Sequence, residues 1–174
     1  MFRTRTPARA LVSALSAAVL AAGCRDITSP AQDPTAVSYA PGLNIRLADF
    51  TRDTSGVYYQ DVAVGSGTAV VPNSTVSYYY TGYLADGRQF GTNTTQSSPT
   101  TFLLGTSPVR GFNLGLLGVR AGGRRRLIIP PALAYGDRAQ GTVIPAGSVL
   151  IFVVDVPAVT APTTTTTTTS RAPR

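Results

Sequence analysis

The strongest constraint on the fold comes from the alternation of side chains between residues 75 and 84. Apolar and aromatic side chains fall on one side of this stretch: Val76, Tyr78, Tyr80 and Leu84. Hydroxyl-bearing residues occupy most of the other side, and this period of two is typical of a β-strand with one buried face. Asp86-Gly87 follows, a pair typical of a tight hairpin turn, so residues 88–90 can return as the partner strand. The chain therefore has to build an antiparallel sheet with a core on one face.

The rest of the central region adds strands and one short helix. Further strands are predicted at residues 57–64, 101–104, 124–129 and 148–156. Phe112, Leu116 and Val119 recur at helical spacing, and Gly122-Gly123 provides the stop. We therefore expect an α+β fold in which an antiparallel sheet of five or six strands folds around one short helix.

The composition excludes several classes of catalyst. All 15 basic residues are Arg, all 8 acidic residues are Asp, and the chain has no His. Without imidazole or a Lys amine, the usual activated Ser or Cys nucleophile and a Lys Schiff base are absent. A single Cys cannot form an internal disulfide, and with no His it cannot complete a zinc site. We therefore expect neither a metal nor another cofactor.

The N-terminal segment predicts export. Three arginines precede an uncharged run from residue 10 to 22, and small residues lead into Cys24, which is the layout of a secretory signal. The stretch that ends at Cys24 resembles the signal of bacterial lipoproteins, which implies cleavage after residue 23 and a lipid on Cys24. The lipid would anchor the exported chain to a membrane of the bacterial cell envelope. The alternative is an ordinary signal peptide with an incidental Cys.

These patterns divide the chain into four regions. Residues 1–23 are the predicted signal peptide, and residues 24–55, which are polar and lack periodicity, are predicted to form a flexible tether. Residues 56–157 are the predicted folded domain. Residues 158–174 include seven consecutive Thr, a run that cannot form a core, so we expect a disordered Thr-rich tail.

Three motifs in the central region point to a known family. Residues 76–90 read Val-Ser-Tyr-Tyr-Tyr-Thr-Gly-Tyr-Leu-Ala-Asp-Gly-Arg-Gln-Phe, residues 122–136 end in Pro-Pro-Ala-Leu-Ala-Tyr-Gly, and residues 144–152 read Ile-Pro-Ala-Gly-Ser-Val-Leu-Ile-Phe. In this order and spacing they resemble the FKBP-type peptidyl-prolyl cis/trans isomerases. The resemblance implies the family fold, a bent antiparallel sheet wrapped on a short helix, for the domain at residues 56–157. It also implies isomerisation of X-Pro bonds, which needs neither a nucleophile nor a general base.

Matching the motifs position by position implies a set of site residues. The walls of a proline pocket would be Tyr80, Phe90, Val109, Ile144 and Phe152, with Phe112 at the floor. The backbone N–H of Val109 and the hydroxyl of Tyr135 would donate to carbonyls beside the proline. Val143 on the loop before Ile144, and Gly91, would contact the substrate at the edges of the pocket.

Two departures from the family pattern keep a second interpretation open. Gly91 stands where the family usually has Asp, and Thr100 stands where a second aromatic is expected. Both changes predict reduced or altered activity. The alternative is a non-catalytic module of the same fold that binds Pro-containing or unfolded chains, and a third hypothesis is a structural envelope lipoprotein without a ligand.

The expected partners follow from the same interpretation. They are X-Pro segments of unfolded or exported polypeptides, bound by a monomer. The run Arg124-Arg125-Arg126 is consistent with an anion-binding surface, yet a strand places only two of the three on one side. We therefore expect a solvated strand end there and no nucleic-acid partner.

Overall fold

The computed structural model describes residues 31–95 and 98–162. The predicted signal peptide, Cys24 and residues 163–174 lie outside the described residues. Within the described ranges, no helix has the length and hydropathy needed to cross a bilayer.

The described residues form one antiparallel sheet of seven strands. The strands are β1 (Thr51–Arg52), β2 (Tyr58–Ala63), β3 (Thr75–Leu84), β4 (Gln89–Asn93), β5 (Thr100–Leu103), β6 (Gly123–Ile129) and β7 (Leu150–Thr160). Their spatial order is β1-β2-β6-β7-β3-β4, and β5 also pairs with β3. The helices are α1 (Arg110–Gly115) and the 3₁₀ turns η1 (Pro41–Leu43), η2 (Leu47–Asp49) and η3 (Pro131–Leu133). The predicted α+β class is confirmed, with the two-residue β1 as an addition.

The predicted hairpin is present at the end of β3. Gly87 adopts a φ of 89°, a left-handed conformation that glycine accepts without strain. The N–H of Leu84 donates to the carbonyl of Arg88 at 2.8 Å and closes the turn. The turn residues therefore set the register in which β4 returns along β3.

The helix is shorter than predicted and begins earlier. Periodicity favoured residues 112–119, whereas α1 ends at Gly115. The following residues bond to another segment, because Gly118 donates to the carbonyl of Val70 at 2.9 Å and Val119 accepts from Val70 at 2.7 Å. Leu116 and Val119 are buried nonetheless. The spacing of apolar residues therefore predicted which side chains are buried but overestimated the length of the helix.

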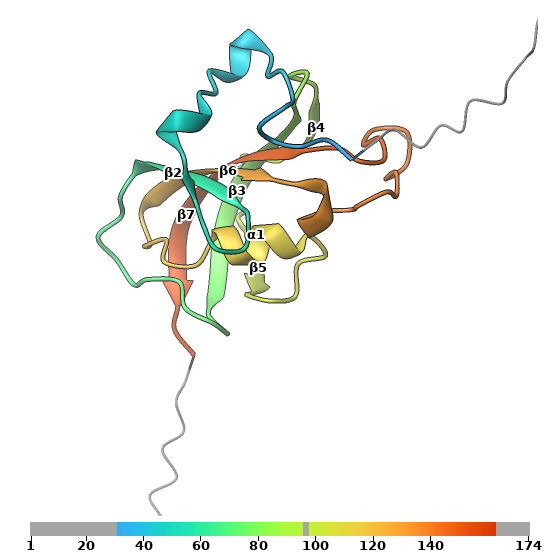
Figure 1. Ribbon diagram of the computed structural model, residues 1–174. Helices are drawn as coiled ribbons and strands as arrows, with labels where there is room; N and C mark the ends of the chain where they lie inside the picture. Colours follow the sequence, from blue (N-terminus) through green and yellow to red (C-terminus); the bar gives the residue numbers. More distant parts are fainter. Residues whose placement is uncertain (1–30, 96–97, 163–174) are drawn as a thin grey trace, which may run out of the picture.

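The N-terminal segment forms a layer on the outer face of the sheet. In Figure 1 residues 31–50 (blue to cyan) lie on one side of the sheet and α1 lies on the other. A second apolar cluster lies between this segment and the sheet, and it includes Phe50, Ala85, Ile128, Val149 and Ile151. Burial of this apolar surface holds the segment in place. Residues 31–55 thus differ from the flexible tether that their composition predicted.

The triple-arginine run is not a solvated strand end, which corrects the expectation. β6 lies between β2 and β7, so both edges of the strand are hydrogen-bonded to neighbouring strands. Arg125 points to the helix side, is only 6% exposed and pairs with Asp61. Arg126 on the outer side donates to the carbonyls of Leu43 and Asn44 at the end of η1. Only Arg124 is well exposed, where it pairs with Asp155 at 3.0 Å.

The last strand extends beyond its predicted end. β7 continues to Thr160, and its final residues pair with the start of β3, with Thr160 opposite Thr75. Residues 158–160 therefore belong to the sheet, not to the predicted tail. Because β7 is central and is covered by α1 on one face and by the N-terminal segment on the other, nearly all its side chains up to Val156 are apolar.

Candidate functional site

Strand register brings the predicted aromatic residues together on the inner face of the sheet. Gly82 of β3 lies opposite Gly91 of β4 on one side and opposite Phe152 of β7 on the other. A Cβ on Gly82 would collide with the ring of Phe90. The absence of a side chain at this position therefore allows the Phe90 ring to lie across β3 towards Phe152.

The rings contact one another at their edges. The centroids of Phe90 and Phe152 are 5.4 Å apart with an interplanar angle of 81°, and those of Phe112 and Phe152 are 5.0 Å apart at 62°. The ring centroid of Tyr78 lies 5.2 Å from that of Phe112 and 5.9 Å from that of Tyr80. Such tilted and edge-to-face pairs are the favoured arrangements of aromatic rings, so they stabilise the shape of the cluster.

These rings do not fill the space between them. A hollow of about 280 Å³ remains, close to the smaller end of small-molecule sites. It is lined by Tyr78, Tyr80, Phe90, Gly91, Ser107, Pro108, Val109, Phe112, Tyr135, Ile144 and Phe152. No charged side chain is among these residues, so the hollow is uncharged and presents aromatic and aliphatic side chains together with hydroxyl and backbone groups.

Most of the predicted site residues meet in this hollow. Tyr80, Phe90, Gly91, Val109, Phe112, Tyr135, Ile144 and Phe152 all line it. Val143 does not, because its side chain is 47% exposed on the loop before Ile144. The prediction omitted Tyr78, although this residue shares the inner side of β3 with Tyr80. It also omitted Ser107 and Pro108, which directly precede Val109.

The two predicted hydrogen-bond donors, the Tyr135 hydroxyl and the Val109 N–H, lie in different surroundings. Burial and the neighbouring Tyr80 raise the pKa of the Tyr135 hydroxyl, which therefore remains a protonated donor at neutral pH. The N–H of Val109 donates to Oγ of Ser107 at 3.3 Å, slightly beyond the usual N–H···O range. This bond is weak enough for a substrate carbonyl to compete for the N–H.

The two departures from the family pattern have visible structural consequences. A Cβ on Gly91 would lie 3.2 Å from Oη of Tyr80, so the tyrosine ring occupies the side of Gly91 where a larger residue would project. Thr100 does not line the hollow, and its Oγ1 accepts from the side-chain amide of Asn93 at 2.7 Å. On the same side of the cluster Phe102 packs 5.2 Å from Tyr78.

Three other hollows formed by the described residues do not bring the predicted site residues together. A larger hollow of about 530 Å³ lies against Tyr79 and the ion pair of Arg124 with Asp155, and none of the predicted site residues lines it. In the described part of the chain, no group of three or more His, Cys or Asp residues is placed to hold a metal ion. The aromatic hollow is therefore the candidate functional site.

Residues 67–157, more than half of the chain, match the model of the FKBP-type peptidyl-prolyl cis-trans isomerases. The chain belongs to this family. FK506-binding protein 4 of Aspergillus fumigatus is 40% identical over 124 residues, which cover 71% of this chain and 25% of that protein. The chain thus spans about a quarter of the length of this FKBP relative.

Two solved structures of bacterial FKBP relatives have a similar fold. A peptidyl-prolyl cis-trans isomerase from Pseudomonas syringae is 27% identical with a TM-score of 0.59, covering 65% of this chain and 82% of that one. FkpA from Escherichia coli is 36% identical with a TM-score of 0.58, covering 64% of this chain and 52% of that one. Both similarities support the fold derived above.

Proposed function

We propose that this FKBP chain catalyses cis/trans isomerisation of X-Pro bonds in exported polypeptides. The observation that carries the proposal is the hollow of about 280 Å³ walled by Phe90, Phe112, Phe152 and Ile144, with the Tyr135 hydroxyl among its lining residues. A prolyl ring needs an apolar cavity of modest size, and an adjacent carbonyl needs one donor. Both requirements are met by residues of the family motifs.

The chemistry of the reaction fits such a site. Rotation about the X-Pro bond faces a barrier of roughly 18–20 kcal/mol because the amide loses conjugation as it twists. The twisted amide is less dipolar than the planar amide, so it loses less hydration in an apolar environment. A dry aromatic hollow therefore binds the transition state better than the ground state, which lowers the barrier without a covalent step.

Individual residues would contribute in distinct ways. The rings of Phe90, Phe112 and Phe152 exclude water from the prolyl ring. The Tyr135 hydroxyl would donate to a carbonyl next to the proline, and the N–H of Val109 would donate to a second carbonyl after leaving Ser107. These donors stabilise the carbonyl orientations that exist only when the amide is twisted.

The rate of isomerisation tests the proposal directly. NMR exchange spectroscopy on short X-Pro peptides would be carried out with the full chain in detergent and with a Tyr135→Phe variant. We expect the wild type to accelerate exchange and the variant to lose about fivefold in kcat/KM, equivalent to a hydrogen bond of roughly 1 kcal/mol. Exchange at the uncatalysed rate with several different residues before proline would reject the enzymatic proposal.

Gly91 supports a second candidate, a non-catalytic module that binds Pro-containing or unfolded chains. Tyr80 lacks a carboxylate neighbour there, and the Val109 N–H already has Ser107 as an acceptor. This candidate predicts chemical-shift changes of Phe90 and Phe152 on addition of a Pro peptide, with no acceleration of exchange. The same titration separates it from a structural protein without a ligand, which would show no shift changes.

We also propose that the chain is exported and anchored by a lipid on Cys24, where it would act on newly exported polypeptides. The support is the signal-like sequence before Cys24. Mass spectrometry of the N-terminal peptide from bacterial membranes tests this proposal. A diacylated Cys24 at the N-terminus is expected, and an unmodified Cys24 or a different N-terminus would contradict it.

A further inference from the structure

The loop between β5 and α1 forms one rim of the aromatic hollow. Ser107, Pro108 and Val109 of this loop all line the hollow, and Val109 carries one of the two proposed donors. The loop has no strand partner of its own, so the direction of the Val109 N–H depends on what else holds the backbone between Gly105 and Val109.

One side chain holds both ends of this loop. Oδ1 of Asn113, in α1, accepts from the N–H of Gly105 at 3.0 Å. Nδ2 of the same amide donates to the carbonyl of Ser107 at 3.0 Å and to that of Val109 at 3.5 Å. All the hydrogen-bonding groups of the amide, one acceptor and two N–H donors, are thus directed at the loop.

These hydrogen bonds affect the Val109 N–H because they hold the peptide groups on either side of it. The N–H of Val109 belongs to the peptide group that joins it to Pro108. Asn113 engages the carbonyls on either side of that peptide, those of Ser107 and Val109. The ring of Pro108 restricts its own φ to near −65°, so little freedom remains between the two fixed carbonyls. The carbonyl of Val109 also accepts from the helix N–H of Phe112 at 3.0 Å. The direction of the Val109 N–H is therefore set by the start of α1 on one side and by the Asn113 amide on the Ser107 side.

We propose that Asn113 is a positioning residue that aims the Val109 N–H and holds the loop rim of the hollow for an X-Pro substrate. The inference deepens the proposed function and rests on it. Asn113 itself is not among the residues that line the hollow, and it acts through the backbone of the loop. Displacement of a positioned donor by about 1 Å commonly costs a large factor in rate.

Replacement of Asn113 by Asp tests the proposal through the pH dependence of kcat/KM. The carboxylate retains an acceptor for Gly105 but turns a second oxygen towards the carbonyls of Ser107 and Val109, which repel it. Protonation of the carboxyl restores one donor. We expect kcat/KM to fall about tenfold at pH 7 and to recover as the pH is lowered towards about 4.

Two further variants separate positioning from general stability. Asn113→Ala removes all three bonds, so we expect a similar loss of kcat/KM that does not change with pH. Asn93→Asp is the matched control, because the Asn93 amide likewise braces a loop, donating to Ser98 and Thr100, but lies outside the lining of the hollow. For this control we expect wild-type kcat/KM and a flat pH profile.

A readout without catalysis distinguishes failure of this inference from failure of the proposed function. The amide resonance of Val109 should move in both Asn113 variants, and in Asn113→Asp it should titrate with pH. Circular dichroism checks that each variant is folded. If the wild type proves inactive, the Val109 resonance still decides the positioning role. An unmoved Val109 resonance, or a flat pH profile in an active Asn113→Asp variant, would overturn the inference.

Discussion

At the scale of single residues, the shape of the hollow depends on two glycines. Gly82 admits the Phe90 ring across β3, and Gly91 leaves space that the Tyr80 hydroxyl approaches. The first glycine creates a wall of the hollow, whereas the second deprives Tyr80 of a carboxylate neighbour. These two positions therefore influence the site as strongly as the aromatic residues themselves.

Restoring Asp at Gly91 should increase turnover. A carboxylate there can accept from the Tyr80 hydroxyl and fix the ring, after the hydroxyl shifts by a few tenths of an ångström to make room. We expect kcat/KM to rise about threefold, the equivalent of roughly 0.6 kcal/mol of net hydrogen bonding. Peptide exchange rates measured by NMR check the prediction. Gly91→Ala adds the crowding without the acceptor, so an equal rise in that variant would contradict this explanation.

At the scale of elements, α1 depends on its surroundings because a six-residue helix is not stable alone. A Cβ on Gly115 would lie 2.6 Å from Cδ2 of Leu127, so the helix rests closely on β6. Arg125 holds its end, donating from Nη1 to the carbonyls of Gly115 and Leu117 at 2.9 Å each. The same guanidinium binds both oxygens of Asp61 and stacks 4.4 Å from the ring centre of Tyr59.

Replacement of Arg125 by Met should strongly destabilise the domain. It leaves the Asp61 carboxylate and two helix carbonyls without their donor, which we expect to cost about 2–4 kcal/mol in the free energy of unfolding. Arg124→Met is the matched control on the neighbouring position, where the ion pair is exposed, and should cost less than about 1 kcal/mol. Urea unfolding of both variants measures the difference, and equal losses would contradict the role assigned to Arg125.

The N-terminal layer should loosen at alkaline pH. Burial raises the pKa of Tyr39 to about 12, and its hydroxyl donates to the carbonyl of Pro34 at 2.8 Å. Because this pKa lies above the ordinary value of 10.0, the tyrosine stabilises the fold below pH 10, and the contribution is lost progressively between about pH 10 and 12. Free energies of unfolding from urea titrations at several pH values should fall less steeply for Tyr39→Phe than for the wild type. Parallel curves would contradict the prediction.

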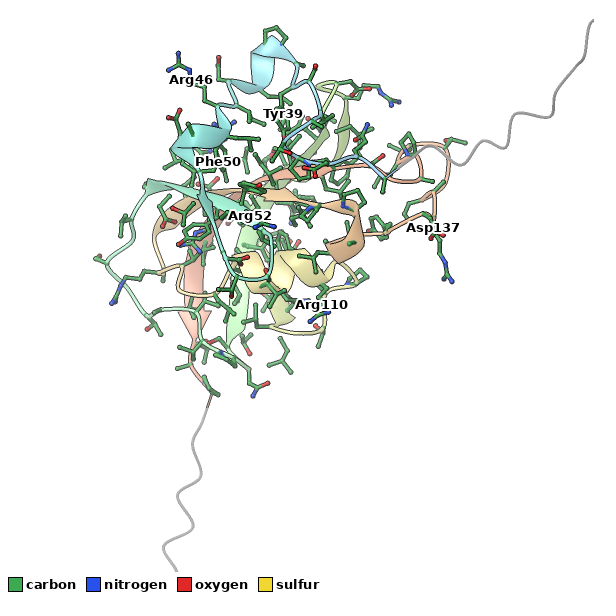
Figure 2. All side chains as sticks on the ribbon, in the orientation of Figure 1. Tyr39, Arg46, Phe50, Arg52, Arg110 and Asp137 are labelled. Carbon is green, nitrogen blue, oxygen red and sulfur yellow. The ribbon has the colours of Figure 1, made fainter. Side chains whose placement is uncertain are left out.

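At the scale of the whole molecule, no side chain that titrates near neutrality lines the hollow. The chain has no His and its single Cys is Cys24. The charged residues next in sequence to the lining, Arg110 at the start of α1 and Asp137 after Tyr135, lie at the periphery (Figure 2). The site is therefore electrostatically insensitive to pH over a wide range.

The proposed isomerase activity should consequently be independent of pH. We expect kcat/KM to stay constant from about pH 5 to pH 9, because no carboxylate lines the hollow and Tyr135, with its raised pKa, remains protonated. NMR exchange spectroscopy measures the rate without a coupling enzyme. A bell-shaped profile centred near neutrality would indicate a general acid or base that the described residues do not provide.

Local patterns predicted the inner face of the domain well. The alternation in β3 identified Tyr80, the Asp86-Gly87 turn placed β4 beside it, and the motifs brought Phe90, Tyr135 and Phe152 to one hollow. These features are readable because strand alternation and turn chemistry act over a few residues. Val143 was predicted to contact the substrate from the loop before Ile144. It is exposed outside the lining of the hollow, so its contact with a substrate stays a prediction.

What the sequence determined by itself is the family, the strand-rich architecture and the aromatic composition of the hollow. Only the tertiary structure decided where the arginines are bound and how the N-terminal segment packs. Arg125 is buried against Asp61, and Arg126 donates to the carbonyls of Leu43 and Asn44. The N-terminal segment is folded onto the sheet. These partners lie more than sixty residues apart along the chain. Whether an arginine is solvated or buried depends on which surfaces meet in space, and no local pattern carries that information.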